Sequence, residues 1–309
     1  MTINNTENPT GTSVLTIGTF DGMHTGHLKL IGKVRLEAKK LGLYSVIVTF
    51  DHHPRFTVSP EPDFCILSPT DEKLDMIRSL GIDQTEVLTF SPELASQSAA
   101  EFLKNYIIPK YKPALIVVGY DSHFGKQRSG NIKFLKKMSH RYDYRVVKVM
   151  PELHNGEPIS SSMIRSYLKR GDLDLANKLL ARRYSITGEV VKGVGVGRQL
   201  GFPTANLSLL EAKQLLPRNG IYLVMAHLDN CSFLGLTNIG FSPTMKSLAK
   251  PEVETHLLGF ENDIYGRKLK IEFIKRIRDE KRFSSRSELV DAMRNDLAIA
   301  ERYKDYEVS

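Results

Sequence analysis

The chain is poor in cysteine and has no long hydrophobic run. Its only cysteines, Cys65 and Cys231, lie far apart and match no metal-ligand spacing, which favours a reducing compartment over a disulfide framework. No apolar stretch is long enough to cross a bilayer, so no membrane association is expected. Residues 1–13 lack the basic start and apolar middle of a signal peptide, which predicts a short disordered lead and a cytoplasmic protein.

The charge balance is basic, with a net charge of +8 and an isoelectric point of about 9.3. Such a surplus suits nucleic acid, a membrane surface or anionic small molecules. The basic residues are spread along the chain and form no separate arm, so nucleic acid is not favoured and solubility or nucleotide binding explains them. With 309 residues, the chain is long enough for one large domain or two of common size.

Strand-like and helical segments alternate through the first half of the chain. Apolar, β-branched runs predict strands at 14–20, 43–50, 85–90, 114–119 and 144–150. Helical spacing of apolar residues predicts helices at 26–40, 70–80, within 91–111 and at 131–142. This alternation is typical of a doubly wound, largely parallel sheet.

The pattern changes near residue 183. Residues 160–183 predict two short helices broken at Gly171. Closely spaced strands then follow at 184–193, 220–228, 232–240, 254–260 and 268–278, which indicates a small antiparallel barrel. An amphipathic helix at 284–303 closes the chain. We place the domain boundary at Arg182, which gives domains 1–182 and 183–309.

The first chemical constellation lies between the first strand and the first helix, where residues 18–27 read GTFDGMHTGH. The carboxyl edge of a parallel sheet binds ligands, and the following helix N-terminus offers N–H groups to phosphate. His24 and His27 are three residues apart, so both imidazoles can face a triphosphate and stabilise the charge of leaving pyrophosphate. A glycine-rich turn with incidental histidines, or a metal-binding pair, is the alternative. The further candidate ATP- or phosphate-binding residues here are Gly18, Phe20, Asp21 and Gly26.

This segment resembles the H-x-G-H signature of the nucleotidylyltransferase superfamily. Its longer form, G-T-F-D-G-x-H-x-G-H, resembles the bacterial bifunctional riboflavin kinase/FAD synthetases in particular. The resemblance implies a Rossmann-like α/β nucleotidylyltransferase domain that transfers an adenylyl group to FMN.

Three further segments of the first half fit the same resemblance. Residues 159–165, ISSSMIR, resemble I-S-S-T-x-I-R, and hydroxyls with a guanidinium at a helix start can hold phosphate. Residues 119–130 resemble G-x-D-F-x-F-G-x-x-R-x-G, with Ser122 in place of Phe, and residues 49–54 resemble T-F-D-P-H-P, with His52 in place of Pro. The candidate residues are Asp121, Ser160 and Ser161 for ATP or phosphate, and Arg165 for the pyrophosphate.

The second constellation is glycine-rich, and residues 193–206 read GVGVGRQLGFPTAN. Thr204 and Asn206 alternate along an extended segment, so both face one side and offer the hard oxygen ligands that suit Mg²⁺. From the glycines alone, a β-hairpin is the simpler interpretation. The segment resembles the riboflavin kinase signature G-R-x-x-G-F-P-T-A-N, which implies a metal and ATP site. The glycine-rich candidates for covering the phosphates are Gly193, Gly195, Gly197, Arg198 and Gly201.

More pieces of the riboflavin kinase pattern follow in order. Residues 238–244 resemble N-I-G-x-x-P-T, and residues 254–266 resemble E-x-H-x-x-x-F-x-x-D-x-Y-G. The resemblance implies that Glu254 is the general base on the terminal ribityl hydroxyl. Residues 276–283, RIRDEKRF, resemble a flavin-contacting loop, which implies that Arg278 and Phe283 bind flavin. The resemblance extends from about Val14 to Tyr303.

The resemblance therefore implies two reactions on one chain. Riboflavin would be phosphorylated by ATP to FMN, and FMN would then be adenylylated to FAD with release of pyrophosphate, with Mg²⁺ in both steps. Small molecules are the expected partners, and a homo-oligomer stays open. Two alternatives remain: a monofunctional synthetase or kinase with one domain weakened, and a flavin-sensing regulator without turnover. A cytidylyltransferase would leave the second half unexplained.

Overall fold

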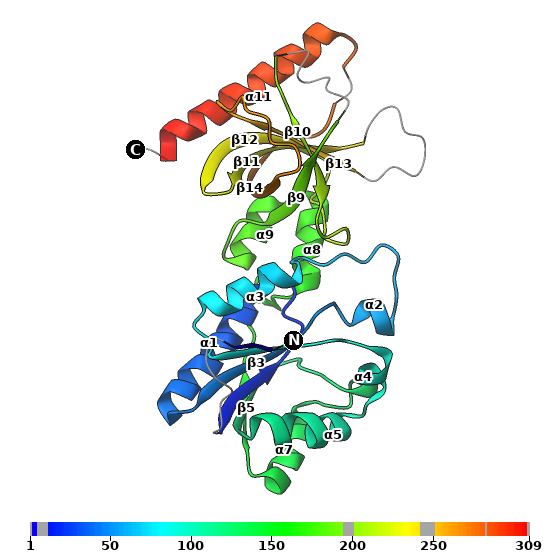
Figure 1. Cartoon of the computed structure of the whole chain (residues 1–309), viewed down its shortest axis with the longest axis vertical. Helices are drawn as coiled ribbons and strands as arrows, with labels where there is room; N and C mark the ends of the chain where they lie inside the picture. The colour runs from blue at the N-terminus through cyan, green and yellow to red at the C-terminus, as the bar shows by residue number, and fades with distance from the viewer. Residues whose placement is uncertain (1, 5–11, 194–200, 242–250, 282, 308–309) are drawn as a thin grey trace. The chain divides into compact units, whose positions relative to one another are not determined.

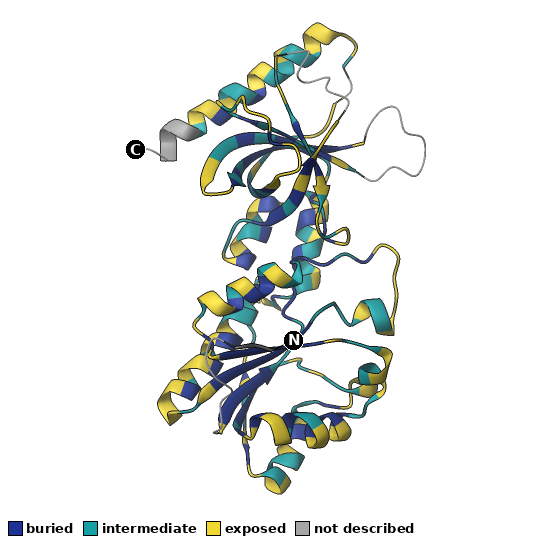
Figure 2. Cartoon of the chain, viewed as in Figure 1, coloured by how far each residue is buried: buried dark blue, intermediate teal, exposed yellow. Residues whose placement is uncertain are grey.

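The computed structural model describes residues 2–4, 12–193, 201–241, 251–281 and 283–307 (Figure 1). The chain divides into two compact units, Met1–Ser161 and Ser162–Ser309. Figure 2 shows that buried residues concentrate in the strands of each unit. Within the described ranges, no helix is both long and apolar enough to cross a membrane.

The first unit contains a six-stranded sheet in the order β1-β4-β3-β2-β5-β6. The strands are β1 (Thr2–Asn4), β2 (Ser13–Ile17), β3 (Tyr44–Phe50), β4 (Gln84–Leu88), β5 (Pro113–Gly119) and β6 (Arg145–Val149). All neighbouring pairs are parallel except β1 and β4, where Thr2 lies opposite Glu86 in an antiparallel ladder. The predicted parallel sheet is thus confirmed. The predicted disordered lead is wrong for Thr2–Asn4, while residues 5–11 lie outside the described residues.

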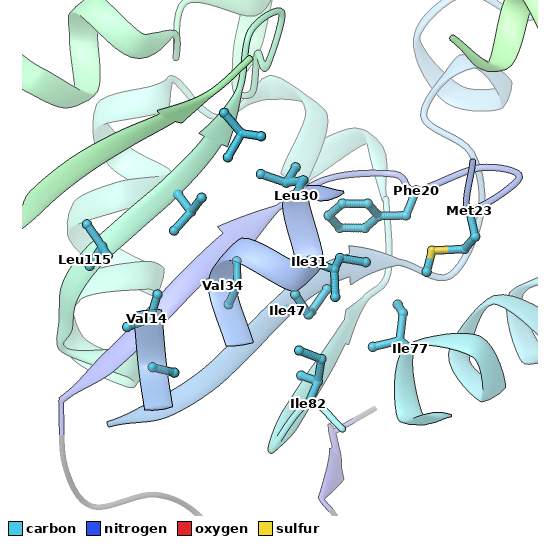
Figure 3. Close-up of a cluster of buried hydrophobic side chains, with 13 residues drawn as sticks. Val14, Phe20, Met23, Leu30, Ile31, Val34, Ile47, Ile77, Ile82 and Leu115 are labelled. Atoms are coloured by element: carbon cyan, nitrogen blue, oxygen red, sulfur yellow. The ribbon is translucent and has the colours of Figure 1, made fainter. Parts of the chain in front are cut away.

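Helices cover both faces of this sheet because successive strand residues point to opposite sides. On β2, Val14 belongs to one core cluster and Leu15 to the other. The Val14 face packs against α1 (Thr25–Leu41) and α3 (Thr70–Ser79), as Figure 3 shows. The opposite face packs against α5 (Ala99–Phe102), the π-helix η1 (Leu103–Ile107), α6 (Ile108–Tyr111) and α7 (Ile132–Tyr142). Short elements complete the unit: α2 (Arg55–Val58), α4 (Pro92–Ser96), η2 (Lys126–Arg128), β7 (Leu153–His154) and β8 (Glu157–Pro158).

The strand order reverses between β2 and β5. The chain passes from β2 to β3 and β4 on one side, and from β5 to β6 on the other. In open α/β sheets, ligands bind beyond the carboxyl ends of the strands at such a switch point. The loops that follow Ile17 and Gly119 therefore mark the expected ligand-binding edge.

The first predicted strand ends earlier than expected. Residues 14–20 were predicted to be extended, but β2 ends at Ile17 and Phe20 adopts a φ of 53°. The apolar run predicted too long a strand, because Phe20 is buried although it lies in a turn. The predicted helices at 26–40 and 70–80 correspond to α1 and α3.

The second unit contains a closed barrel of six antiparallel strands in the order β10-β13-β12-β11-β14-β9. Its strands are β9 (Ser185–Val191), β10 (Ala205–Leu209), β11 (Gly220–Leu228), β12 (Cys231–Gly240), β13 (Glu252–Leu257) and β14 (Lys268–Arg278). The C-terminal helix α11 (Arg286–Glu307) follows. The predicted barrel and closing helix are confirmed, and β10 is an additional strand.

Two short helices, α8 (Ser161–Arg170) and α9 (Leu173–Leu180), precede the barrel and meet at Gly171, as predicted. The side chain of Asn177 on α9 donates to the carbonyl of Phe273 on β14 (3.0 Å) and accepts from the N–H of Tyr184 (2.7 Å). These bonds group α9 with the barrel, and the compact division falls after Ser161. Arg182 remains our proposal for where the two catalytic modules divide.

Candidate active sites

The turn after β2 is held in an unusual backbone conformation. Phe20 (φ 53°), Gly22 (φ 80°) and Met23 (φ 44°) all adopt left-handed conformations. Such strain persists only where surrounding structure over-determines it. The side chains of Phe20 and Met23 are almost completely buried in the core beneath α1 (Figure 3), and a β-carbon at Gly22 would overlap Leu67. Burial of Phe20 and Met23 on the Val14 face of the sheet therefore holds the turn in this conformation.

Asp21 anchors the turn through its own hydrogen bonds. Its carboxylate accepts from the N–H groups of Leu67 (2.8 Å) and Ser68 (3.2 Å), and its main-chain oxygen accepts from the Ser161 hydroxyl (2.8 Å). The structure thus gives Asp21 and Ser161 a role in holding the turn and gives Phe20 a place in the core. The predicted contacts of these three residues with ATP remain predictions.

His24 and His27 form a stacked pair at the start of α1. Their ring centroids are 3.7 Å apart with an interplanar angle of 20°, and His24 is the N-cap residue, 5% exposed. A β-carbon at Gly26 would lie 3.1 Å from the His24 ring, so glycine permits this close approach. No acidic residue occupies the first turn of α1, which leaves the helix N-terminus suited to an anion.

The pKa of His27 is held well below its ordinary value. Burial is the main cause, and the neighbouring His24 and Lys73 lower it further. The imidazole is therefore neutral at physiological pH and can donate only one N–H. Within the described residues its Nδ1 is buried and has no hydrogen-bond partner.

The loop after β5 lies beside the same helix. A β-carbon at Gly119 would lie 3.8 Å from Asp121 Oδ1 and 3.9 Å from Leu30 on α1. The Ser122 hydroxyl, which replaces Phe, accepts a hydrogen bond from the Gly119 N–H (2.8 Å) and closes the turn locally. Asp121 is exposed. The structure thus brings this loop to the edge that carries the histidine pair.

His52, which replaces Pro in the T-F-D-P-H-P pattern, also has local partners. His52 Nδ1 lies 2.7 Å from Asp51 Oδ1, and its Nε2 lies 3.1 Å from the Thr57 hydroxyl. Of the remaining predicted phosphate ligands, Ser160 directly precedes α8, and Arg165 lies on α8 in the second unit. Their predicted roles remain predictions.

A cavity of about 240 Å³ opens between the barrel and α11. It gathers residues that were predicted separately as metal ligand, base and flavin contacts, namely Thr204, Glu254, Arg278 and Phe283. Apolar lining comes from β11, β12 and α11, including Ile221, Leu236 and Leu297. A pocket with mostly apolar walls and a few convergent polar groups is the usual form of a small-molecule site.

The barrel register sets the polar end of this cavity. Glu254 on β13 lies opposite Asn206 on β10 and opposite Asn238 on β12. Burial raises the pKa of Glu254, and the neighbouring Glu252 raises it further. A raised pKa brings a carboxylate closer to the range in which it serves as a general base.

The glycine-rich segment is described only at its two ends. A β-carbon at Gly193 would overlap the Asn206 side chain, so Gly193 lies directly against the predicted metal ligand. Gly201 has a φ of 85°, which a residue with a side chain rarely adopts. Gly195, Gly197 and Arg198 lie outside the described residues.

Arg278 is held by α11. Its guanidinium makes a two-pronged ion pair with Asp296, with Nε–Oδ1 and Nη2–Oδ2 distances of 3.0 and 2.7 Å. Its Cζ lies 5.8 Å from the centre of the Phe283 ring. Asp296 is only 5% exposed, so this pair ties the end of β14 to the helix that walls the cavity.

Sequence reasoning missed three residues at these sites. Lys73 is buried beside the histidine turn, the turn after β2 that leads into His24 and His27. Asp296 forms an ion pair with Arg278. Asn238 lines the cavity, and its buried Oδ1 has no hydrogen-bond partner among the described residues. Asn238 is the first residue of the N-I-G-x-x-P-T segment, and that resemblance was a signal for it. The other two carried no signal, because their burial depends on tertiary packing.

A parallel-sheet unit with a histidine turn at its switch point, joined to a barrel with a Thr–Asn–Glu cavity, defines a two-domain nucleotide-dependent transferase. The model of the FAD synthetase family matches residues 6–163, and that of the riboflavin kinase family matches residues 180–304. The chain belongs to the family of bifunctional riboflavin kinase/FMN adenylyltransferases.

Similar proteins match over almost the whole chain. The bifunctional riboflavin kinase/FMN adenylyltransferase of Buchnera aphidicola subsp. Acyrthosiphon pisum is 35% identical, over 97% of this chain and 96% of that protein. The protein of the same name from Bacillus subtilis is 35% identical, over 94% and 92%. A crystal structure described as a macrolide-efflux protein from Streptococcus pneumoniae is 31% identical, covers 94% of both chains and has a TM-score of 0.86.

Proposed function

We propose that this chain phosphorylates riboflavin to FMN in the barrel unit and adenylylates FMN to FAD in the parallel-sheet unit. The observation that carries the proposal is the barrel cavity, which gathers Thr204, Glu254, Arg278 and Phe283 from distant parts of the sequence. Family membership supports both activities over either alternative, because both halves match. We propose a cytoplasmic location on the same grounds.

In the kinase step, the apolar walls of the cavity take the flavin ring and Glu254 receives the ribityl chain. The Glu254 carboxylate takes the proton of the terminal hydroxyl as that oxygen bonds to the γ-phosphorus of ATP. The bond from the γ-phosphorus to the β,γ-bridging oxygen breaks, and ADP leaves. Positioning and charge neutralisation supply most of the catalysis in such transfers.

The nucleotide would approach from a second, smaller hollow. Residues of β9, β10 and β13 and of the 260–265 segment line it, and Thr204 lines both this hollow and the main cavity. Thr204 therefore lies where a nucleotide on one side would meet a ribityl chain on the other. This shared residue supports an ATP site on that side of the barrel.

The donor set at Thr204 and Asn206 fits Mg²⁺. A hydroxyl and an amide oxygen are hard ligands, and Mg²⁺ usually adds phosphate oxygens and waters to a small number of protein ligands. Among the described residues, no group of three or more His, Cys, Asp or Glu side chains could hold a metal ion. When bound, Mg²⁺ would neutralise phosphate charge.

In the adenylylation step, an FMN phosphate oxygen bonds to the α-phosphorus of ATP. The bond from the α-phosphorus to the α,β-bridging oxygen breaks, and pyrophosphate leaves. No strong general base is required, because FMN is already an anion. His24, His27 and the N-terminus of α1 stabilise the leaving group, with Arg165 proposed as a further ligand.

The direct test is a chromatographic time course of the full chain with ATP and Mg²⁺, started in one reaction from riboflavin and in another from FMN. The proposal expects FMN and then FAD from riboflavin, and FAD from FMN. FAD from FMN with riboflavin untouched would leave a monofunctional synthetase. FMN without FAD would leave a kinase, and no product with retained flavin binding would favour a regulator.

A further inference from the structure

Lys73 is an unusual residue of the first unit because it is a lysine on the buried face of a helix. It lies on α3 together with Leu74 and Ile77 and is only 5% exposed. Lysine is almost never fully buried unless its ammonium group is paired. Neither the motifs described above nor the proposed chemistry uses it.

The ammonium group of Lys73 links the end of β3 to the turn that follows the neighbouring parallel strand β2. Its Nζ donates to the main-chain oxygen of Phe50, the last residue of β3, over 2.8 Å. It also donates to the main-chain oxygen of Thr19, in the turn after β2, over 3.3 Å. The Thr49 hydroxyl also donates to the Thr19 main-chain oxygen (3.3 Å), and this oxygen therefore accepts two hydrogen bonds.

The charge of Lys73 is retained in this setting. Burial lowers the pKa of its ammonium to about 8, and the carboxylates of Asp21 and Asp51 oppose that shift. The group is therefore mostly charged at neutral pH. Asp21 belongs to the histidine turn and Asp51 to the segment after β3, so Lys73 lies among charges from both loops.

We propose that Lys73 is a positioning residue for adenylyl transfer, which ties the strained turn that leads into His24 and His27 to the carboxyl end of β3. The inference rests on the proposed adenylylation. The turn holds Phe20, Gly22 and Met23 in left-handed conformations and needs external support. Asp21 supplies one anchor through Leu67 and Ser68, and Lys73 supplies another through Thr19.

The positioning role predicts a loss of rate more than of binding. A misplacement of about 1 Å costs on the order of a hundredfold in rate, so loss of one tether should lower kcat by about 10- to 100-fold. The turn supports groups that act mainly on the leaving pyrophosphate, so the KM for FMN should change by less than about threefold.

The experiment compares the full-length wild type with Lys73→Met, which keeps the side-chain length and removes the charge and its donors. Lys33→Met is the matched control, because Lys33 lies on α1 and pairs only with Glu37 on the same helix in the described structure. FAD formation from FMN is measured for kcat and KM. Riboflavin phosphorylation by the same samples reports an intact barrel and should not change.

A second readout does not depend on activity. The ring resonances of His24 and His27, assigned through His24→Gln and His27→Gln in histidine-labelled protein, should shift in Lys73→Met and stay in place in Lys33→Met. A folded Lys73→Met protein with wild-type kcat, or with lowered kcat but unmoved ring resonances, would overturn the positioning role.

Two further outcomes distinguish a failure of the positioning role from a failure of the proposed adenylylation. If Lys73→Met fails to fold, Lys73→Arg is used instead: its longer, planar guanidinium should displace the His24 and His27 ring resonances and lower kcat by about tenfold. A lowered kcat with unmoved resonances would refute the role. Wild-type protein that forms no FAD from FMN would refute the proposed function. Shifted histidine resonances in Lys73→Met would still support the tether.

Discussion

Asn206 and Glu254 lie opposite each other on the neighbouring antiparallel strands β10 and β13. The amide that is proposed to hold Mg²⁺ and the carboxylate that is proposed to take the ribityl proton are thus fixed by one strand pairing. A β-strand is a rigid support compared with a loop, and groups held this way keep their spacing. The next two residues of the constellation, Thr204 and Asn238, join from the segment before β10 and from β12.

The first prediction concerns the base. Glu254→Gln keeps the size of the side chain and removes its capacity to take a proton, so FMN formation should fall by about 10²- to 10⁴-fold. FAD formation from supplied FMN should be unchanged, because it is assigned to the other unit. The measurement is initial rates from riboflavin and from FMN with the same preparation.

Glu189→Gln is the matched control, since Glu189 is an exposed carboxylate on the barrel strand β9 and lies outside the described lining of the cavity. It should leave FMN formation within about twofold of wild type. Equal losses in both variants would mean that the loss is not specific to the carboxylate at Glu254.

The second prediction concerns the histidine pair that is proposed to stabilise the leaving pyrophosphate. His27→Gln removes an imidazole donor at the N-terminus of α1, so FAD formation should fall by about 10²- to 10³-fold, the usual effect of losing one preorganised donor. FMN formation should persist. His140→Gln, which changes an exposed histidine on α7, should leave both rates intact. Loss of both activities in folded His27→Gln protein would contradict the division into two sites.

Much of the fold could be predicted because its causes are local. Alternating apolar runs and helical periodicity indicated the parallel sheet, and close strands with glycine-rich turns indicated the barrel. The errors have tertiary causes. Phe20 is buried because it lies in a turn that packs into the core, and β1 pairs at a sheet edge that no local pattern specifies.

The candidate sites were predictable to a different degree. Thr204, Glu254, Arg278 and Phe283 were found because their motifs resemble a known family, and the structure brings them to one cavity. Spacing alone could not have joined residues that lie up to 79 positions apart, 283 minus 204. Buried polar partners such as Asp296 are invisible in the sequence, since any helix can carry an aspartate on any face.

The third prediction uses the lowered pKa of Lys73. In the unfolded chain a lysine has a pKa of about 10.4, whereas Lys73 in the fold has a pKa of about 8. Between these values the unfolded state binds more protons, so the free energy of unfolding rises with pH through this group. From pH 7 to pH 9, wild type should gain about 1 kcal/mol relative to Lys73→Met.

The measurement is pulse proteolysis in urea at both pH values, with cleavage of the first unit followed by mass spectrometry. Lys33→Met, which removes a partly exposed ammonium group on α1, is measured alongside as the control. If Lys73→Met gained as much stability as wild type between pH 7 and pH 9, the lysine would not be buried as a charge.

The fourth prediction concerns the ion pair that holds Arg278. Asp296→Asn leaves the guanidinium without its carboxylate, and loss of one partner of a largely buried pair typically costs about 3 kcal/mol of unfolding free energy. Arg278 would also lose its fixed orientation beside Phe283, so the KM for riboflavin should rise by about tenfold or more.

Asp291→Asn is the matched control, since Asp291 pairs with Arg294 on the exposed face of the same helix. FAD formation from supplied FMN should be unaffected in both variants. An Asp296→Asn protein with wild-type stability and KM would show that α11 closes the cavity without help from this pair.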